Sequence, residues 1–185
     1  MAESDWKLAP EAMSEAQRRV YDEIAAGPRK SVPTPFHVLL ASPRTAEHAQ
    51  RLGAFLRYDS ELPRPLYELA VLVTAEAWGA GYEWSVHAIS AAREGVPAEV
   101  IEAIRHGKEP AFADPDMALI WRFASTFHRT RRIPPDLAEA AIARFGKKAA
   151  VELTAILGYY AFLAMQLGLA DIRVTPWPFP GDGPT

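Results

Sequence analysis

The sequence predicts an all-α fold, and three observations lead to that prediction. Apolar residues recur at spacings of three and four over most of the chain, which is the pattern of amphipathic helices. No segment keeps the two-residue alternation that a half-buried strand needs. Proline, glycine and N-cap residues punctuate the chain at intervals that suit helices of ordinary length. We therefore expect about seven to eight helices, built around an antiparallel helical hairpin.

The first helices are predicted from caps and prolines. Ser14-Glu-Ala-Gln17 has the spacing of a capping box, and the helix that it opens ends at Gly27-Pro28. The stretch through Pro33 and Pro35 is expected to be an extended connector, because the residue before a proline disfavours the helical conformation. Ser42-Pro43 combines an N-cap residue with proline at the first helical position, so a second helix is expected there.

The later helices are bounded in the same way. Pro63 and Pro65 precede an apolar helix that ends at a hinge, Gly79-Ala-Gly81, and the next helix stops at Gly95. The further boundaries are Val96-Pro-Ala-Glu99 to Gly107, a start at Asp114-Pro115, Pro134-Pro135 to Gly146, and a last helix over Lys147–Leu169. After Thr175 the chain is rich in proline and glycine, which excludes a regular element. Trp177 and Phe179 are expected to pin this tail to the body or to a neighbouring subunit.

The composition of the chain excludes several classes of function but does not indicate a particular one. The formal net charge of -3 offers no general attraction to nucleic acid or to an anionic membrane, so neither is expected as a partner. The chain has no cysteine, which excludes disulfides, thiolate metal sites and thiol peroxidase chemistry. The first residues lack the basic and apolar regions of a signal peptide. The apolar run 155–165 is shorter than the about 20 residues that span a bilayer, so a cytoplasmic protein is expected.

The segment from Tyr67 to His87 concentrates the groups that can perform acid–base chemistry. It holds three carboxylates, one histidine and four aromatic residues, in two apolar stretches on either side of the glycine hinge. Glu83 and His87 lie four residues apart, so on a helix their side chains share a face. Glu68 lies on the preceding helix, which folds back if the hinge is a helix–helix turn. We expect Glu68, Glu83 and His87 to converge in a partly apolar pocket.

Other readings of these residues stay open at this point. His87 could be a core histidine bonded to a carboxylate, and Glu68, set among apolar neighbours, is expected either to be paired or to have a raised pKa. Tyr82 and Trp84 could wall the pocket or belong to the core. A divalent metal on Glu68, Glu83 and His87 is a further alternative. Three further histidines, His48, His106 and His128, are interpreted as surface residues. Glu76 is interpreted as a solvated residue near a helix end.

The chain resembles the carboxymuconolactone decarboxylase family, which includes the AhpD-like alkylhydroperoxidases. The pattern Glu68 followed by Tyr82-Glu-Trp-x-x-His87 carries the resemblance most specifically. Hydrophobic texture extends it over about residues 33–175. The segments are Pro35-Phe-His-Val-Leu-Leu-Ala-Ser-Pro43, Leu52-Gly-Ala-Phe-Leu-Arg57, Glu68-Leu-Ala-Val-Leu72 and Val151-Glu-Leu-Thr-Ala-Ile-Leu-Gly-Tyr-Tyr160. The resemblance implies an all-helical AhpD-like fold and a homo-oligomer, a trimer or hexamer.

The chain departs from the peroxidase branch of that family in its sulfur chemistry. There the motif reads Cys-x-x-Cys-x-x-x-His with a glutamate on the preceding helix. His87 and Glu68 fall on that histidine and that glutamate, whereas Ala80 and Glu83 stand in the places of the two cysteines. The positions that relay protons are present and both thiols are missing. The resemblance therefore leaves open the decarboxylase branch, which needs acid–base groups and no thiol.

We accordingly predict three segments: an N-terminal helix and connector over residues 1–32, a carboxymuconolactone decarboxylase-like domain over 33–175, and a tail over 176–185. The predicted function is decarboxylation, or a related proton transfer, of a small carboxylated lactone or enol-acid substrate, with no cofactor required. His87 would shuttle the proton, Glu83 would orient its imidazole, and Glu68 would act as a second relay or base. Substrate contacts are expected from Tyr82, Trp84, His37 and Arg64. The alternative is a non-catalytic oligomeric small-molecule-binding or scaffold protein of the same fold.

Overall fold

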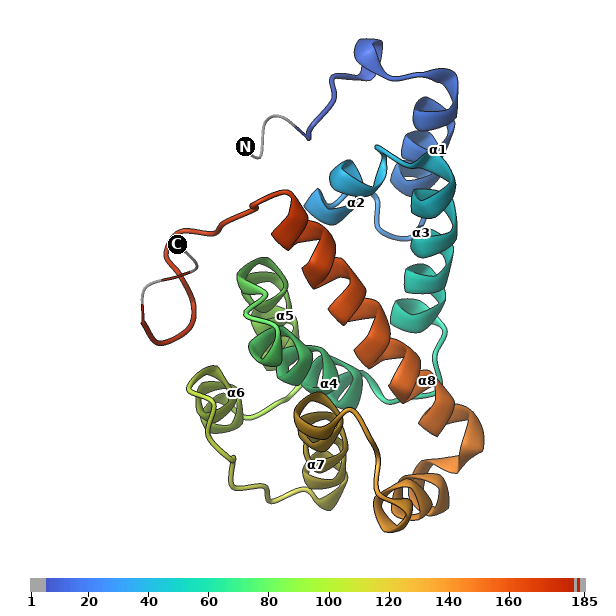
Figure 1. The fold of residues 1–185 in the computed structure, drawn as a ribbon. Coiled ribbons are helices and arrows are strands. Elements are labelled where there is room, and N and C mark those ends of the chain that lie inside the picture. Colours follow the sequence, from blue (N-terminus) through green and yellow to red (C-terminus); the bar gives the residue numbers. More distant parts are fainter. Residues whose placement is uncertain (1–5, 182, 184–185) are drawn as a thin grey trace. The chain divides into compact units, whose positions relative to one another are not determined.

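The computed structural model describes residues 6–181 and 183, and within these residues every regular element is a helix (Figure 1). The first five residues, and Asp182, Pro184 and Thr185 of the predicted tail, lie outside the described part of the chain. The elements are the 3₁₀ turn η2 (Pro10–Ala12), α1 (Glu15–Ala26), α2 (Thr34–Leu39), α3 (Pro43–Tyr58), α4 (Arg64–Ala77), α5 (Gly81–Arg93), α6 (Ala98–Arg105), α7 (Pro115–Thr130) and α8 (Pro135–Leu169). The all-α prediction is confirmed.

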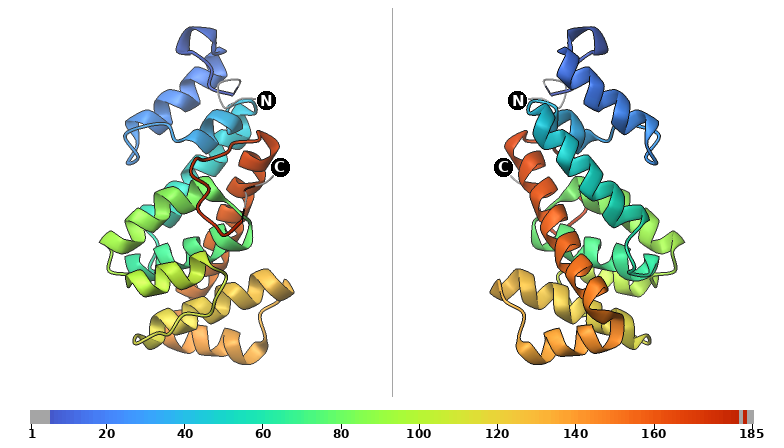
Figure 2. Two further views of the ribbon diagram at one scale, coloured as in Figure 1. Left: turned by 90° about the vertical axis from the view of Figure 1, so that its left-hand side faces the viewer. Right: turned by 90° about the vertical axis from the view of Figure 1, so that its right-hand side faces the viewer.

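The helices form two compact units. The first holds α1, α2 and α3 together with Met165–Ile172 at the end of α8, and the second holds α4 to α7, the rest of α8 and the C-terminal tail. Within the first unit, α3 packs against both α1 and α2. Within the second, α4 packs against α5, α6 and α7 (Figures 1 and 2). The domain limits expected from the sequence stay predictions.

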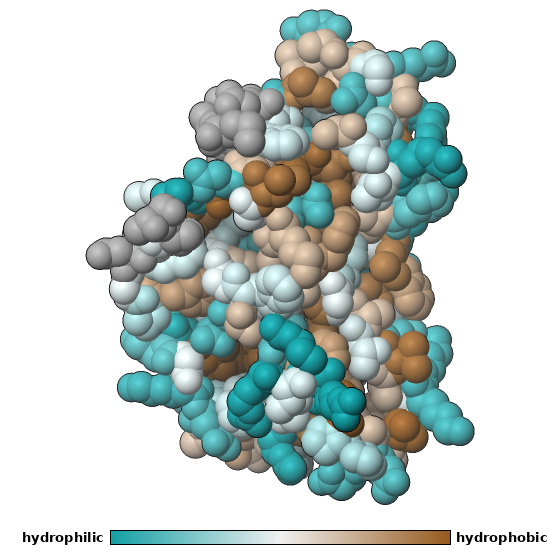
Figure 3. Space-filling model, in the orientation of Figure 1, coloured by the Kyte–Doolittle hydropathy of each residue, from teal (hydrophilic) through white to brown (hydrophobic). Residues whose placement is uncertain are grey.

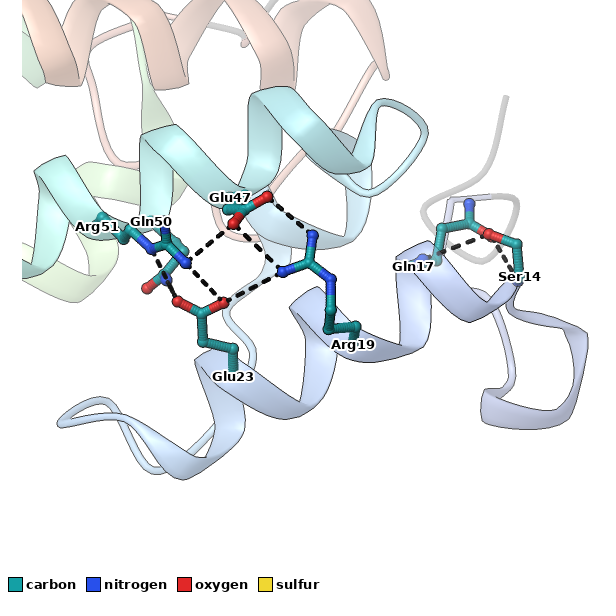
Figure 4. Close-up of polar contacts among 7 residues, drawn as sticks. All are labelled: Ser14, Gln17, Arg19, Glu23, Glu47, Gln50 and Arg51. Carbon is teal, nitrogen blue, oxygen red and sulfur yellow. Dashed lines mark hydrogen bonds and ion pairs between the residues drawn. The ribbon is translucent and has the colours of Figure 1, made fainter.

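In the first unit, α1 begins as its sequence predicts. The Ser14 backbone N–H donates to the Gln17 side chain over 2.9 Å, and the Gln17 N–H donates to the Ser14 hydroxyl over 3.3 Å, which completes a capping box (Figure 4). Ion pairs then link α1 to α3. The Arg19–Glu47 and Arg51–Glu23 pairs each measure 2.9 Å, and the side chains of both arginines are more than half exposed (Figure 4). Such exposed pairs contribute little to stability, so the buried apolar face of α1 holds the helix in place.

The connector predicted through Pro33 and Pro35 is wrong, because these residues enter the short helix α2. Pro33 is its N-cap residue and Pro35 lies in its first turn. Backbone N–H groups of a first turn have no partner inside the helix, so proline there removes no hydrogen bond. Phe36, Val38 and Leu39 are buried, and the burial of their apolar side chains stabilises the helix.

In the second unit, α4 is the central helix, and every residue from Leu66 to Ala75 is buried. It ends at Ala77, and α5 begins at Gly81 after a turn in which Gly79 has a φ of +58°, a conformation that glycine adopts without strain. Two contacting helices joined by so short a turn run antiparallel. The predicted hairpin is therefore confirmed, with the hinge at its tip.

The helix α8 contains the boundary that the sequence predicts. Gly146 has a φ of 86° and a ψ of 161°, so the helical path breaks between the two segments expected there. The apolar part of α8 extends beyond the 155–165 run. By length and composition α8 is the one described helix that could cross a membrane. Half of its most apolar stretch is buried inside the protein, as in the core helix of a folded domain.

The C-terminal tail packs on the start of α5. The Phe179 ring lies 5.1 Å from the Trp84 ring, edge to face, and Arg105 donates a hydrogen bond to the Pro178 carbonyl over 2.9 Å. The Trp177 ring covers Gly81 so closely that a Cβ atom there would lie 2.7 Å from it. The prediction that Trp177 and Phe179 pin the tail to the body is thus confirmed for the described residues of the tail.

Candidate active site

The carboxylate of Glu68 is buried in the hairpin, where an unpaired charge would be unfavourable. Glu68 lies in the middle of α4, fully buried among apolar residues. Its Oε2 atom lies 2.6 Å from Nδ1 of His87 on α5, and its Oε1 atom accepts a hydrogen bond from the guanidinium of Arg64, one turn earlier on α4. A buried charge is tolerated when it is paired and hydrogen-bonded in this way. Of the two alternatives expected for Glu68, pairing or a raised pKa, the structure shows pairing.

His87 is held by Glu68 on one side and by an aromatic ring on another. The imidazole is only 4 % exposed, and the ring of Tyr160 on α8 meets it edge to face at 4.9 Å between centroids. A carboxylate can only accept, so the Nδ1 atom carries the proton of this hydrogen bond and Nε2 keeps the lone pair in the neutral ring. This carboxylate–imidazole arrangement orients a proton-transfer group. The predicted convergence of Glu68 and His87 across the hairpin is confirmed.

Tyr160 extends the cluster, although it was not among the site residues expected from the sequence. Its hydroxyl lies 2.6 Å from that of Tyr67, a residue 93 positions away in the sequence, and both side chains are buried. The guanidinium of Arg64 also lies over the Tyr67 ring, 4.6 Å from its centroid. The only sequence signal for Tyr160 was its place in a segment that resembles the family by hydrophobic texture.

Glu83 has a different environment from the one predicted. It is 2 % exposed, and neither of its carboxyl oxygens has a hydrogen-bond partner among the described residues. Burial without a partner raises the pKa of Glu83 to about 8, so the carboxyl is neutral at pH 7. The predicted role of Glu83 in orienting the imidazole is therefore wrong: Glu68 holds the His87 ring, because Nδ1 faces across the hairpin rather than along α5.

The other predicted substrate-binding residues are distributed over both units. Trp84 is buried against Phe179 of the tail, which supports the core reading, and Tyr82 is half-buried in the first turn of α5. The Arg64 side chain pairs with Glu68 and is still 36 % exposed. His37 belongs to α2 in the first unit, where it helps to line a small cavity of about 90 Å³.

No group of three or more His, Cys, Asp or Glu side chains in the described part of the chain could hold a metal ion. The metal alternative for Glu68, Glu83 and His87 therefore has no geometric support in residues 6–181 and 183. A larger cavity of about 370 Å³ lies elsewhere in the second unit, and His128 lines it. The expectation that His128 is a surface residue is wrong, since it is only 8 % exposed.

Comparison with known proteins finds a family match over the part of the chain that contains the hairpin. A model of the carboxymuconolactone decarboxylase family matches residues 43–125, a region that contains Glu68, Glu83 and His87. A search of curated proteins found no match to the chain. The matched region runs from the start of α3 into α7 and holds no cysteine. The family resemblance seen in the motifs is therefore confirmed over residues 43–125, where the chain is similar to the carboxymuconolactone decarboxylase family but has no cysteine.

Proposed function

We propose that this protein is a thiol-independent acid–base enzyme that decarboxylates a small carboxylated lactone or enol-acid substrate. The observation that carries the proposal is the buried Glu68–His87 hydrogen bond across the hairpin, on the same helix pair as a carboxyl group kept neutral by burial. A buried carboxyl group with a raised pKa near a carboxylate–histidine pair is typical of acid–base sites. With no cysteine in the chain, a thiol peroxidase reaction has no nucleophile.

In the proposed reaction the C–C bond to the carboxylate breaks, CO2 leaves, and the electron pair passes into an extended enolate. The imidazolium form of His87 then returns a proton from Nε2 to carbon, and the Glu68 carboxylate stabilises that imidazolium through Nδ1. Glu83, as a neutral acid, replaces the proton on His87 or hydrogen-bonds the enolate oxygen. Arg64 anchors the substrate carboxylate through the exposed part of its guanidinium. None of these steps requires a cofactor.

A panel of small lactone and enol carboxylic acids, screened for CO2 release, supplies the substrate for the test. We expect His87→Gln to keep the fold and to lower turnover by roughly 10²–10⁴-fold, the usual contribution of a positioned acid or base. His106→Gln is the matched control, because His106 is exposed and lies outside the hairpin. Glu68→Gln should change the pH profile as well as the rate, since it removes the charge beside the imidazole.

Wild-type turnover in His87→Gln would leave Glu68 and His87 as a structural hydrogen-bond cluster. One observation favours that second candidate, a non-catalytic oligomeric binding or scaffold protein: the His87 imidazole is almost wholly buried. A compound that binds without CO2 release, proton exchange or isomerisation would support it. Turnover that His87→Gln abolishes would exclude it.

We also propose that the protein works in the cytoplasm as a homo-oligomer, a trimer or hexamer, and binds neither nucleic acid nor membrane. Large apolar side chains at the surface support self-association, among them Ile89 of α5 at 56 % and Val151 of α8 at 67 % exposure. Apolar residues also lie among polar ones on the face shown in Figure 3. Sedimentation as a monomer at micromolar concentration would contradict the oligomer.

A further inference from the structure

A second candidate site lies in the second unit, apart from the Glu68–His87 pair. The end of α4, the end of α6 with the residues that follow it, and the second half of α7 line a half-open cavity of about 370 Å³, which we call the α4–α7 cavity. The lining residues that bear on its chemistry are Glu76, Ile104, Lys108, Trp121, His128 and Arg129. Its size is in the range of small-molecule sites, and it combines apolar walls with a few polar groups of both charges.

His128 lines this cavity, and its hydrogen bond to Thr74 fixes which ring nitrogen carries the proton. The Thr74 hydroxyl donates its one proton to the Ala70 carbonyl over 2.8 Å, so it must accept from Nε2–H of His128 over 3.0 Å. The Nδ1 atom therefore carries the lone pair. Burial, with the nearby Arg131 adding to it, lowers the pKa of His128 to about 4. The imidazole thus stays neutral, and Nδ1 stays an acceptor, at physiological pH.

Glu76 supplies a second acceptor, and its charge is not balanced within the described protein. The side chain is half-buried, and no cation among the described residues lies within ion-pair distance of it. Its carboxylate reaches over Gly107, where a Cβ atom would lie only 3.2 Å from Oε1. Burial raises the pKa of Glu76 because it removes water from the carboxylate. A ligand that carries positive charge and donates hydrogen bonds would compensate the carboxylate for that lost water, so the site would favour such a ligand.

The same cavity has two cationic side chains, Lys108 and Arg129. Both residues are exposed, and neither side chain makes an ion pair with a described residue. The half-buried indole of Trp121 and the side chain of Ile104 form apolar wall beside them. The cavity therefore offers two acceptors, two cations and an apolar surface, a set that neither a simple anion nor a hydrocarbon would satisfy.

We propose that the α4–α7 cavity binds a small zwitterionic amino acid with an apolar or aromatic side chain. The ammonium group, which only donates, faces Glu76 and Nδ1 of His128. The carboxylate, which only accepts, faces Lys108 and Arg129, and the side chain packs on the wall formed by Trp121 and Ile104. This site is separate from the proposed catalytic hairpin, and its occupancy does not depend on the proposed reaction.

Isothermal titration calorimetry on the full chain tests the proposal with three probes: L-phenylalanine, 3-phenylpropionate, which lacks the ammonium group, and 2-phenylethylamine, which lacks the carboxylate. We expect L-phenylalanine to bind, and each analogue to bind at least about tenfold more weakly, because it loses charge-assisted hydrogen bonds. Glu76→Gln and Arg129→Gln should each weaken L-phenylalanine binding by about tenfold. Arg122→Gln is the matched control, since Arg122 is also exposed on α7 but does not line the cavity, and the variant should bind L-phenylalanine as the wild type does.

Equal affinity for the three probes would overturn the proposal, and so would unchanged binding in both Glu76→Gln and Arg129→Gln. Displacement of L-phenylalanine by equimolar inorganic phosphate would also overturn it, because it would show a site for anions alone. Absence of binding by L-phenylalanine at about ten millimolar, a concentration that detects even millimolar dissociation constants, would exclude the site. Circular dichroism of each variant checks that the helical fold is intact.

Discussion

The sharpest consequence of the hairpin is a pH-dependent cost of keeping Glu83 buried. Burial raises the pKa of Glu83 from an ordinary 4.5 to about 8 in the folded protein. The folded state therefore holds a proton that the unfolded chain releases between these two values. Stability falls with rising pH wherever the folded state binds more protons. With respect to this group, stability is therefore highest below pH 4.5 and falls as the pH rises to about 8.

The magnitude follows from the size of the shift. Each pKa unit corresponds to about 1.4 kcal/mol, so at pH 7 the group costs about 3 kcal/mol relative to an unshifted carboxyl. The cost approaches about 5 kcal/mol above pH 8. Glu83→Gln replaces the carboxyl by a neutral group of the same shape. We therefore expect the variant to unfold at higher urea concentration than the wild type at pH 8, and the two to coincide near pH 4.5.

Urea unfolding followed by circular dichroism at several pH values between 4.5 and 8.5 measures this difference. Both proteins carry the same other titrating groups, so their difference isolates Glu83. Glu94→Gln, an exposed position at the end of α5, is the control and should follow the wild type at every pH. Parallel stability curves for the wild type and Glu83→Gln would refute the reasoning. They would mean that water or rearrangement solvates the carboxylate when it ionises.

Further outcomes follow from the packing of the second unit. Tyr67→Phe removes the buried hydrogen bond to Tyr160 and should lower the free energy of unfolding by about 1–2 kcal/mol, while Tyr58→Phe, at an exposed position, should change it little; urea unfolding measures both. Gly81→Ala places a methyl group 2.7 Å from the Trp177 ring and should loosen the tail, seen as faster amide exchange beyond residue 174; exchange unchanged from the wild type would mean that the tail accommodates the methyl group. The chain should sediment as a trimer or hexamer.

Much of the secondary structure could be predicted from the sequence, because its signals act over a few residues. The Ser14 capping box, the hinge at Gly79 and the break at Gly146 all lie where the pattern of caps and glycines places them. The pairing of Glu68 with His87 was also within reach, since a short turn between two apolar helices leaves one arrangement for the hairpin. The one helix missed, α2, shows the limit: its first-turn proline is compatible with either state, and burial of Phe36 decides.

The composition and local pattern by themselves determined an all-helical, cysteine-less chain with a carboxylate–histidine pair on one hairpin. Only the tertiary structure decided which carboxyl group would hydrogen-bond to the imidazole of His87. Helical spacing brings Glu83 and His87 to one face, but it does not determine whether Nδ1 points to Glu83 or to Glu68. The environments of Tyr160 and His128 likewise depend on packing between residues far apart in the sequence. The Tyr160 hydroxyl on α8 meets that of Tyr67, and the His128 ring on α7 is buried beside Thr74 of α4. Hydrogen bonds and burial are set by neighbours in space, and those neighbours are fixed when the helices pack.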